Sequence, residues 1–209
     1  MSKKSNKLLI FTKSPILGEV KTRLQPDYTP EQSLIVHKRL MLNTLELTKN
    51  LKEFDIELCC APDRNTSFFL ECEKNFPISL NNQEGADIGE RMAFSLSVSL
   101  QTHEKVIVIG TDCPDIDEDY ITQAFAALDE NDAVIGPASD GGYVLLGLTK
   151  FSMDIFTDIS WGSEKVFTQT KKVFENLSWS LKELGIMHDL DRPEDLLKHQ
   201  DLLNEIRDC

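Results

Sequence analysis

The 209-residue chain lacks the features of a secreted, membrane-spanning or nucleic-acid-binding protein. No apolar run approaches the length that spans a bilayer, and the run at 8–11 is too short for the core of a signal peptide. The formal net charge of −13 argues against nucleic-acid and anionic-membrane partners, although a local basic cluster could still bind a small anion. The five cysteines are odd in number and lack the paired spacings of a zinc site or a disulfide framework. We therefore expect reduced thiols in a cytoplasm at Cys59, Cys60, Cys72, Cys113 and Cys209.

Familiar nucleotide-binding and hydrolase motifs are also missing. The chain has neither G-x-x-x-x-G-K-[ST] nor G-x-G-x-x-G, so P-loop and dinucleotide-binding proteins are poor comparisons. It has no G-x-S-x-G, which removes the usual nucleophile elbow of a hydrolase. A phosphatase with an aspartyl nucleophile would carry acids directly after its first strand, where Thr12 and Lys13 stand instead.

The apolar pattern predicts one α/β domain over residues 1–209, because the chain has no repeat, linker or low-complexity tract. Strands are expected at 8–11, 54–61, 77–80, 106–110, 132–137, 143–148 and 177–184, with 143–148 antiparallel to the strand before it. Helices are expected at 30–51, 64–75, 116–128 and 163–174. A further helix is expected to begin after Asp87, which is a plausible N-cap, and the C-terminal helix is expected to begin near residue 191. The β-branched run 106–109 has no in/out alternation, which suits a strand covered on both faces.

The strand predicted at 106–110 ends abruptly in Asp112 and Asp115. Ligands of open parallel sheets bind at the carboxyl ends of strands, so Asp112 is a candidate ligand. The alternative is that both acids cap the next helix. The basic loop described below and a late acid, Asp189, favour the ligand role for Asp112, whereas Asp115 fits the turn into the helix.

The segment 12–24 follows the first strand and is rich in cations. Lys13, Lys21 and Arg23 stand there with two hydroxyls and the flexible Gly18. Rigid donors, compensating charge and freedom of backbone approach are what a polyphosphate needs. The alternative is a solvated loop that happens to be basic.

Other polar residues allow two interpretations each. Asp140, beside Gly141 and Gly142, is either a turn former or a cleft acid. Asp191 and Glu194 resemble a capping box, which leaves Asp189 as the unexplained acid. His37 is expected at the surface, Arg91 either at the surface or in the cleft, and Trp161 either in the core or against a ligand.

Five motifs carry a family resemblance. They are F-T-K-S-P-x-x-G-x-V-K-T-R-L at 11–24, I-G-T-D-C-P-D-I at 109–116, S-D-G-G-Y-V-L-L-G-L at 139–148, W-G-S at 161–163 and D-L-D-R-P-E-D-L at 189–196. From residue 8 to 197 the chain resembles a bacterial family of glycosyltransferase-A-like proteins, long catalogued as a domain of unknown function and sometimes labelled arsenosugar-biosynthesis-associated. More distantly it is similar to 2-phospholactate guanylyltransferases and molybdenum-cofactor nucleotidyltransferases.

The resemblance implies a nucleotide-diphosphosugar transferase fold. This is a three-layer α/β/α sandwich around a mixed, mostly parallel sheet of seven strands, with a nucleotide held by the first loop. Asp112 matches the divalent-metal position of such folds, and Asp189 or Asp191 matches a late acidic motif. The residues expected in the site are Asp112, Asp140 and Asp189 for catalysis, Asp112 and Asp189 for Mg²⁺ or Mn²⁺, and Thr12, Lys13, Pro15, Gly18, Lys21, Arg23, Gly141 and Gly142 for the nucleotide.

The sequence thus predicts a metal-dependent transferase with a nucleotide-activated substrate. The leading hypothesis is a glycosyltransferase that moves a sugar from a nucleotide sugar to a small-molecule acceptor. One alternative is a nucleotidyltransferase that joins a nucleoside triphosphate to a phosphorylated metabolite and releases pyrophosphate. A non-catalytic nucleotide-binding module is the other alternative.

Overall fold

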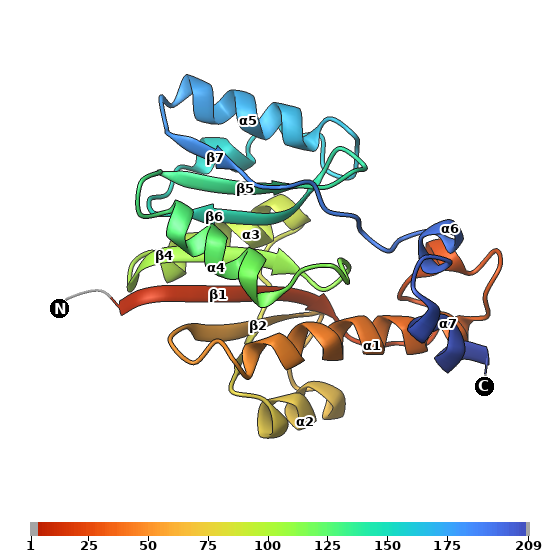
Figure 1. The fold of residues 1–209 in the computed structure, drawn as a ribbon. Coiled ribbons are helices and arrows are strands. Elements are labelled where there is room, and N and C mark those ends of the chain that lie inside the picture. Colours follow the sequence, from red (N-terminus) through yellow and green to blue (C-terminus); the bar gives the residue numbers. More distant parts are fainter. Residues whose placement is uncertain (1–3, 208–209) are drawn as a thin grey trace.

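A sheet of seven strands in the order β3-β2-β1-β4-β6-β5-β7 forms the centre of the computed structural model, which describes residues 4–207 (Figure 1). β1, β2, β3, β4 and β7 pair in parallel with a neighbour, while β6 runs antiparallel between β4 and β5. The predicted mixed, mostly parallel sheet is confirmed. The strands are β1 (Lys4–Lys13), β2 (Asp55–Ala61), β3 (Ser79–Asn82), β4 (His103–Gly110), β5 (Ala133–Pro137), β6 (Tyr143–Leu148) and β7 (Leu181–Glu183).

Helices cover both faces of the sheet because its central strands are apolar on both sides. In β4, Ile107 and Ile109 pack on the face that carries α1, α2 and α4, while Val106 and Val108 pack on the face that carries α3 and α5. The uninterrupted β-branched run therefore lies between two helical layers, as predicted. The helices are α1 (Pro30–Thr48), α2 (Ser67–Asn75), α3 (Ile88–Ser99), α4 (Glu118–Ala127) and α5 (Val166–Asn176), with short 3-10 turns η1 (Thr22–Leu24) and η2 (Met153–Phe156).

The C-terminal segment forms a separate apolar cluster beyond the carboxyl end of the sheet. α6 (Pro193–Leu196) and α7 (Gln200–Arg207) lie against α1 (Figure 1). The fully buried Leu190 and Leu196 pack there with Leu24 of the first loop. The end of the chain is thereby anchored next to the loop that follows β1.

Several predicted boundaries were wrong, and capping explains the one at the start of α4. α4 begins at Glu118 and not at 116, because Asp117 accepts a hydrogen bond from the Tyr120 amide; neither Asp112 nor Asp115 caps it. α5 begins at Val166 and not at 163, and β7 is a short edge strand within the predicted 177–184. β3 lies two residues later than predicted. The N-cap at Asp87 is confirmed by its bond from the Glu90 amide.

The described cysteines, Cys59, Cys60, Cys72 and Cys113, are buried free thiols, whereas Cys209 lies outside the described residues. Burial raises the pKa of Cys60 and of Cys113 to about 12, so both remain protonated thiols at neutral pH. Within residues 4–207, none of the helices has the length and apolar character that crossing a membrane requires.

Candidate functional site

A cleft of about 700 Å³ opens at the carboxyl ends of β1 and β4. One wall comes from the loop after β1, and another from the residues that follow β4. The start of β6, the segment before α6, the residues around the start of α3 and the segment before α5 also line it. Most of the predicted site residues line this cleft: Thr12, Lys13, Lys21, Arg23, Asp112, Asp140, Gly142 and Asp189.

Three predicted nucleotide-binding residues do not line the main cleft. Gly141 lines a neighbouring hollow. Pro15 and Gly18 line neither hollow; Gly18 has a left-handed φ of 80° and gives the loop its turn.

The ammonium of Lys21 is the best-connected polar group in the cleft. It lies 2.7 Å from Oδ1 of Asp112 and 3.3 Å from Oδ1 of Asp191, and it donates to the Leu190 carbonyl at 2.5 Å. Only 4% of the Lys21 side chain is exposed, against 50% of Asp112 and 37% of Asp191. An ammonium has three N–H donors, so these oxygens use all of its hydrogen-bonding capacity. Lys21 lines the cleft, but its three donors are used by these protein oxygens, so its predicted contact with phosphate would require them to be exchanged.

The ion pairs shift the pKa values of both partners. Burial alone lowers the pKa of Lys21, but the charges of Asp112 and Asp191 outweigh it, and the net pKa is raised. Burial alone raises the pKa of Asp112, but the charge and hydrogen bond of Lys21 outweigh it, and the net pKa is lowered. Both groups are therefore charged at neutral pH.

Asp189 behaves differently from the other cleft acids. Burial is the main cause that raises its pKa to about 7, and the negative charges of Asp112, Asp140 and Asp191 raise it further. Lys21 offsets only part of this. Around Asp189, the negative charge of the neighbouring carboxylates therefore exceeds the positive charge that Lys21 supplies.

Asp191 lies in the cleft, where the family resemblance allowed it, and not at the helix cap that the residue pattern favoured. The expected capping box with Glu194 does not form; instead the Asp195 carboxylate accepts from the amides of Arg192 and Asp191, at 3.0 and 3.3 Å. The carboxylate of Asp191 is left to face Lys21 and the exposed Arg23, whose guanidinium lies 3.0 Å away. Asp191 is thus a cleft acid that sequence reasoning assigned to the helix.

Backbone bonds fix the segment that carries these acids. The Leu190 amide donates to the carbonyl of Asp112 at 2.8 Å, and the Leu190 side chain is fully buried. The end of β4 and the segment 189–191 therefore hold each other in place.

Two further cleft residues were expected elsewhere or went unnoticed. His37 was expected at the surface, but its side chain is buried and its Nε2 lies 2.9 Å from the Lys13 carbonyl. Gln83 was not singled out, yet its side-chain amide donates to the carbonyls of Thr12 and Cys59 at 3.0 and 2.8 Å. Both residues support the end of β1. The single sequence carried no signal for either role, since each depends on a contact between distant segments.

Arg91 and Trp161 both line the cleft. The Arg91 Nε donates to the Gly85 carbonyl at 3.0 Å, and within residues 4–207 this side chain makes no ion pair. Trp161 is half-buried and meets Tyr143 edge to face at 6.4 Å between ring centroids. A Cβ on Gly89 would overlap the Trp161 ring, so Gly89 makes room for it. Trp161 therefore both packs on the core and presents part of its surface to the cleft.

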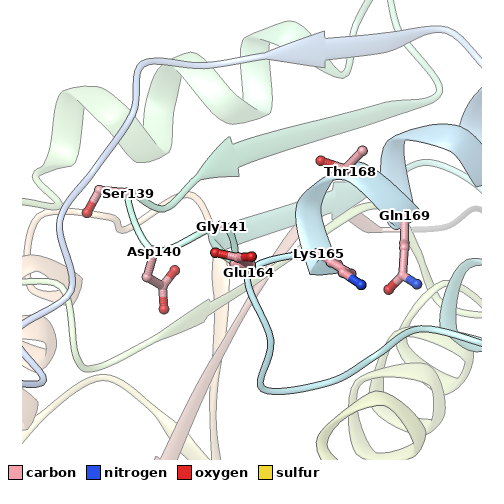
Figure 2. A pocket seen from close by; sticks show the side chains of 7 residues that line it. All are labelled: Ser139, Asp140, Gly141, Glu164, Lys165, Thr168 and Gln169. Carbon is pink, nitrogen blue, oxygen red and sulfur yellow. The ribbon is translucent and has the colours of Figure 1, made fainter.

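Asp140 connects the cleft to a neighbouring hollow of about 470 Å³ (Figure 2). The hollow lies between the β5–β6 hairpin and the start of α5, and its other lining groups include Glu164, Lys165 and Thr168. Asp140 accepts from the Gly142 amide at 2.9 Å, which makes it a turn former as well as a cleft acid. The Gly141 carbonyl accepts from the Phe167 amide at 2.9 Å and ties the hairpin to α5.

The donor set of the cleft fits a divalent cation such as Mg²⁺ or Mn²⁺. Mg²⁺ is usually bound by one or two carboxylates together with phosphate oxygens and water, so a complete protein cage is not needed. Within the described residues no group of three His, Cys, Asp or Glu side chains could hold a metal alone. Asp112 and Asp189 lie close enough for the charge of one to raise the pKa of the other, and the Lys21 ammonium already stands as a cation against Asp112.

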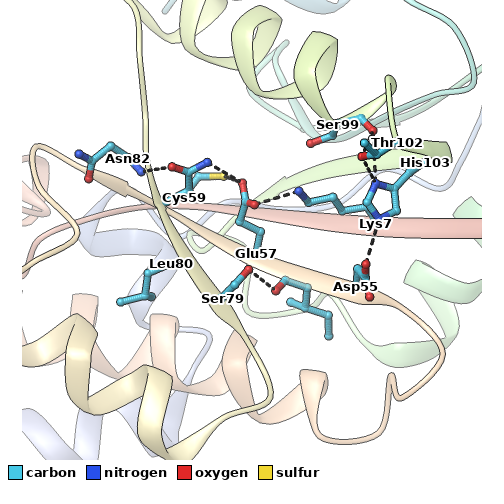
Figure 3. Close-up of polar contacts among 12 residues, drawn as sticks. Lys7, Asp55, Glu57, Cys59, Ser79, Leu80, Asn82, Ser99, Thr102 and His103 are labelled. Atoms are coloured by element: carbon cyan, nitrogen blue, oxygen red, sulfur yellow. Dashed lines mark hydrogen bonds and ion pairs between the residues drawn. The ribbon is translucent and has the colours of Figure 1, made fainter. Parts of the chain in front are cut away.

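A second polar cluster lies toward the amino ends of the strands, at the end of the sheet opposite the cleft, and its contacts join neighbouring strands (Figure 3). Lys7 pairs with Glu57 at 2.8 Å, and His103 Nε2 lies 3.0 Å from an Asp55 oxygen. These residues stand at or near the amino ends of β1, β2 and β4, whereas the cleft lies at the carboxyl ends. They hold strands together and take no part in the cleft.

Comparison with known proteins assigns a family. The profile of a family described as uncharacterized proteins conserved in bacteria, DUF2064, matches residues 44–163, a range that includes Asp112 and Asp140. The chain belongs to this family. No curated protein matches the chain in sequence.

Solved structures confirm the fold. A provisionally assigned nucleotide-diphospho-sugar transferase from Desulfovibrio desulfuricans G20 is similar with a TM-score of 0.87 and 28% identity, over 99% of this chain and 98% of that one. The 4-diphosphocytidyl-2C-methyl-D-erythritol synthase of Anaerococcus prevotii DSM 20548 is similar at 0.63 and 14% identity, over 96% and 99%. Rv0371C of Mycobacterium tuberculosis H37Rv, in complex with manganese, is similar at 0.52 and 12% identity, over 97% and 100%. The DUF2064 chain thus has the nucleotide-diphosphosugar transferase fold.

Proposed function

We propose that this protein is a divalent-metal-dependent transferase that uses a nucleotide-activated substrate, with a nucleotide sugar as donor and a small molecule as acceptor. The observation that carries the proposal is the arrangement of the main cleft. A basic loop after β1 faces Asp112 after β4 across a volume within the range of ligand pockets, which is roughly 300–1,000 Å³. Likeness over nearly the full length to a provisionally assigned nucleotide-diphospho-sugar transferase supports the choice of donor.

The first loop would bind the diphosphate. Among residues 4–207 the exposed Lys13 ammonium has no ion-pair partner, and the Arg23 side chain is 60% exposed. Both can turn toward phosphate oxygens, and the guanidinium can do so with two parallel N–H bonds. Asp112, with Asp189 or Asp191 as the late acid, would hold Mg²⁺ or Mn²⁺, whose chemistry is to stabilise the negative charge that develops on a departing diphosphate.

The acceptor would approach through the hollow beside Asp140. This carboxylate lines both cavities, so it stands where a donor in one would meet an acceptor in the other. The lining of hydroxyl, carboxylate, amide and ammonium groups suits a hydroxyl-rich acceptor. Asp140 or Asp189 would accept the proton from the attacking hydroxyl, a role for which a positioned carboxylate is suited.

Nucleotidyl transfer is the second candidate, and the fold comparison favours keeping it. A protein named as a diphosphocytidyl-product synthase shares this fold over nearly its whole length, so the fold itself is compatible with that reaction. Here the cleft would hold a nucleoside triphosphate, and a phosphorylated metabolite would occupy the hollow beside Asp140.

The products separate the two reactions. The protein would be incubated with Mn²⁺ and either nucleotide sugars plus polyhydroxylated acceptors, or GTP and CTP plus phosphorylated acids such as 2-phospholactate. Glycosyl transfer releases a nucleoside diphosphate, and nucleotidyl transfer releases pyrophosphate. Acceptor-dependent release of a nucleoside diphosphate supports the proposal, and pyrophosphate release supports the second candidate. Nucleotide binding with neither product would contradict both and indicate a non-catalytic module.

A further inference from the structure

The Lys21 ammonium occupies a cage of oxygens that also suits a divalent cation. Two carboxylate oxygens, from Asp112 and Asp191, and the Leu190 carbonyl converge on it at 2.7, 3.3 and 2.5 Å. Carboxylate and carbonyl oxygens are the ligands that hard divalent cations prefer. The same oxygens therefore could serve either kind of cation.

The backbone that carries the cage oxygens is held by contacts that do not involve Lys21. Asp112 follows β4, and the segment 189–191 is fixed to it by the bond between the Leu190 amide and the Asp112 carbonyl. The buried Leu190 side chain anchors that segment in the cluster formed with α6 and α7. Without Lys21, two carboxylates would still face the same point.

The first loop brings Lys21 into the cage under strain. Lys21 has φ 47° and ψ 40°, a left-handed conformation that is unfavourable for a residue with a side chain. Such a conformation persists only where its surroundings impose it, and the ion pairs of the ammonium supply that constraint. The lysine stem is flexible and lines the cleft, so the ammonium can reach a ligand there.

One cage cannot hold both cations, because like charges at contact distance repel strongly in a partly desolvated site. We propose that Lys21 is an exchangeable counter-ion: its ammonium fills the cation position between Asp112 and Asp191 in the free protein and yields it to a divalent cation. The freed ammonium then turns to the phosphates of the nucleotide. Metal and nucleotide are thereby coupled, since the metal displaces a charge that the phosphates of the nucleotide can pair again. This inference rests on the proposed function for the metal and the nucleotide.

Manganese binding without nucleotide tests the exchange directly. Free Mn²⁺ would be measured by electron paramagnetic resonance with the wild type, Lys21→Gln, Lys21→Arg and Arg23→Gln. We expect Lys21→Gln to bind Mn²⁺ roughly tenfold or more tightly than the wild type, because the competing cation is gone. Lys21→Arg keeps a cation and should stay near the wild type. Arg23→Gln should change affinity by no more than about threefold, because Arg23 is exposed and its charge is screened.

Equal or weaker Mn²⁺ binding by Lys21→Gln would overturn the exchange. The proposed function has a separate readout, which is binding of UDP or GDP with Mn²⁺ to the wild type. If the wild type binds these nucleotides with Mn²⁺ but Lys21→Gln gains no affinity for Mn²⁺ alone, only the exchange fails. If the wild type binds neither nucleotide, the proposed function fails.

A second measurement uses the wild type alone and so does not depend on how the variants fold. The protein would be acetylated briefly at its lysines, once in the presence of a chelator and once in saturating Mg²⁺. Mass spectrometry would then measure how far each lysine had reacted. Buried and fully hydrogen-bonded, Lys21 should react slowly in the chelator and several-fold faster in Mg²⁺, while the exposed Lys13 serves as the internal control. If Lys21 stays equally protected in saturating Mg²⁺, the exchange is contradicted.

Discussion

The Lys21 ammonium lies 2.7 Å from Oδ1 of Asp112 and so joins the loop after β1 to the end of β4. The contact brings the candidate phosphate-binding loop against the candidate metal ligand before any ligand is bound. Asp191 completes the arrangement from the C-terminal segment. Stability and ligand binding of this cleft should therefore depend on the same few charges.

Replacing Lys21 with methionine should destabilise the ligand-free protein more than replacing Arg23. Removing one partner of a fully buried ion pair costs about 3–5 kcal/mol, but Asp112 and Asp191 are partly exposed and water can solvate them. We expect a loss of about 1–3 kcal/mol for Lys21→Met and less than about 1 kcal/mol for Arg23→Met. Urea unfolding in a chelator measures both values. Equal losses in the free energy of unfolding would show that the buried contacts of Lys21 stabilise the protein no more than the exposed ion pair of Arg23.

His37 should make stability fall in acid. Burial lowers the pKa of its ring in the folded protein, whereas the pKa of the ring in the unfolded chain is about 6.5. Below that pH the unfolded state takes up a proton that the folded state binds less well, so the free energy of unfolding decreases as pH drops. His37→Gln keeps an N–H donor for the Lys13 carbonyl but cannot titrate. Relative to the variant, the wild type should lose up to about 1.4 kcal/mol per pH unit between pH 6.5 and 5. Parallel curves for the two proteins would contradict this.

Gly18 and Gly141 both have positive φ, and comparing their alanine variants separates the cost of backbone strain from the cost of steric overlap. Gly18 has φ 80° and open space around its Cβ position, so Gly18→Ala should cost about 1 kcal/mol from conformation alone. Gly141 has φ 90°, and a Cβ there would overlap the Glu164 main chain. Gly141→Ala should cost at least about 2 kcal/mol, since the hairpin must move away from α5. Thermal or urea unfolding compares the pair, and equal costs would show that the hairpin is not held against α5.

Trp161 should report ligand binding by its fluorescence. It lines the cleft, whereas Trp179 lies outside it, with the Lys150 ammonium 4.6 Å from its ring centroid. A nucleotide that enters the cleft with Mn²⁺ should change the emission of the wild type and of Trp179→Phe, and leave that of Trp161→Phe nearly unchanged. A signal that survives in Trp161→Phe would place the ligand elsewhere.

The fold could be predicted because local patterning specifies it. The uninterrupted run in β4 indicated a strand covered on both faces, and Asp87 marked a helix start through a bond to an amide three residues away. Boundaries were less predictable where short polar residues compete for the cap, as Asp117 does with Asp115 before α4.

The candidate site could be predicted only in part, because its contacts join distant segments. The basic loop, Asp112, Asp140 and Asp189 follow from their places after predicted strands or in acidic motifs. The residue pattern alone did not predict the position of Asp191, since Asp195 and not Glu194 accepts from the Asp191 amide, and the Asp191 carboxylate faces Lys21. The partners of Lys21 likewise depend on how the C-terminal segment packs.

Calorimetric titration with Mn²⁺ and UDP-, GDP- and CDP-linked sugars tests the central claim most directly. The wild type and Asp115→Asn, which changes an exposed acid in the same turn, should bind at least one of these ligands with equal affinity. Asp112→Asn should bind it at least about tenfold more weakly, because the metal loses a carboxylate ligand. Binding of none of these ligands to the wild type, or unchanged binding to Asp112→Asn, would contradict a metal-dependent nucleotide site in this cleft.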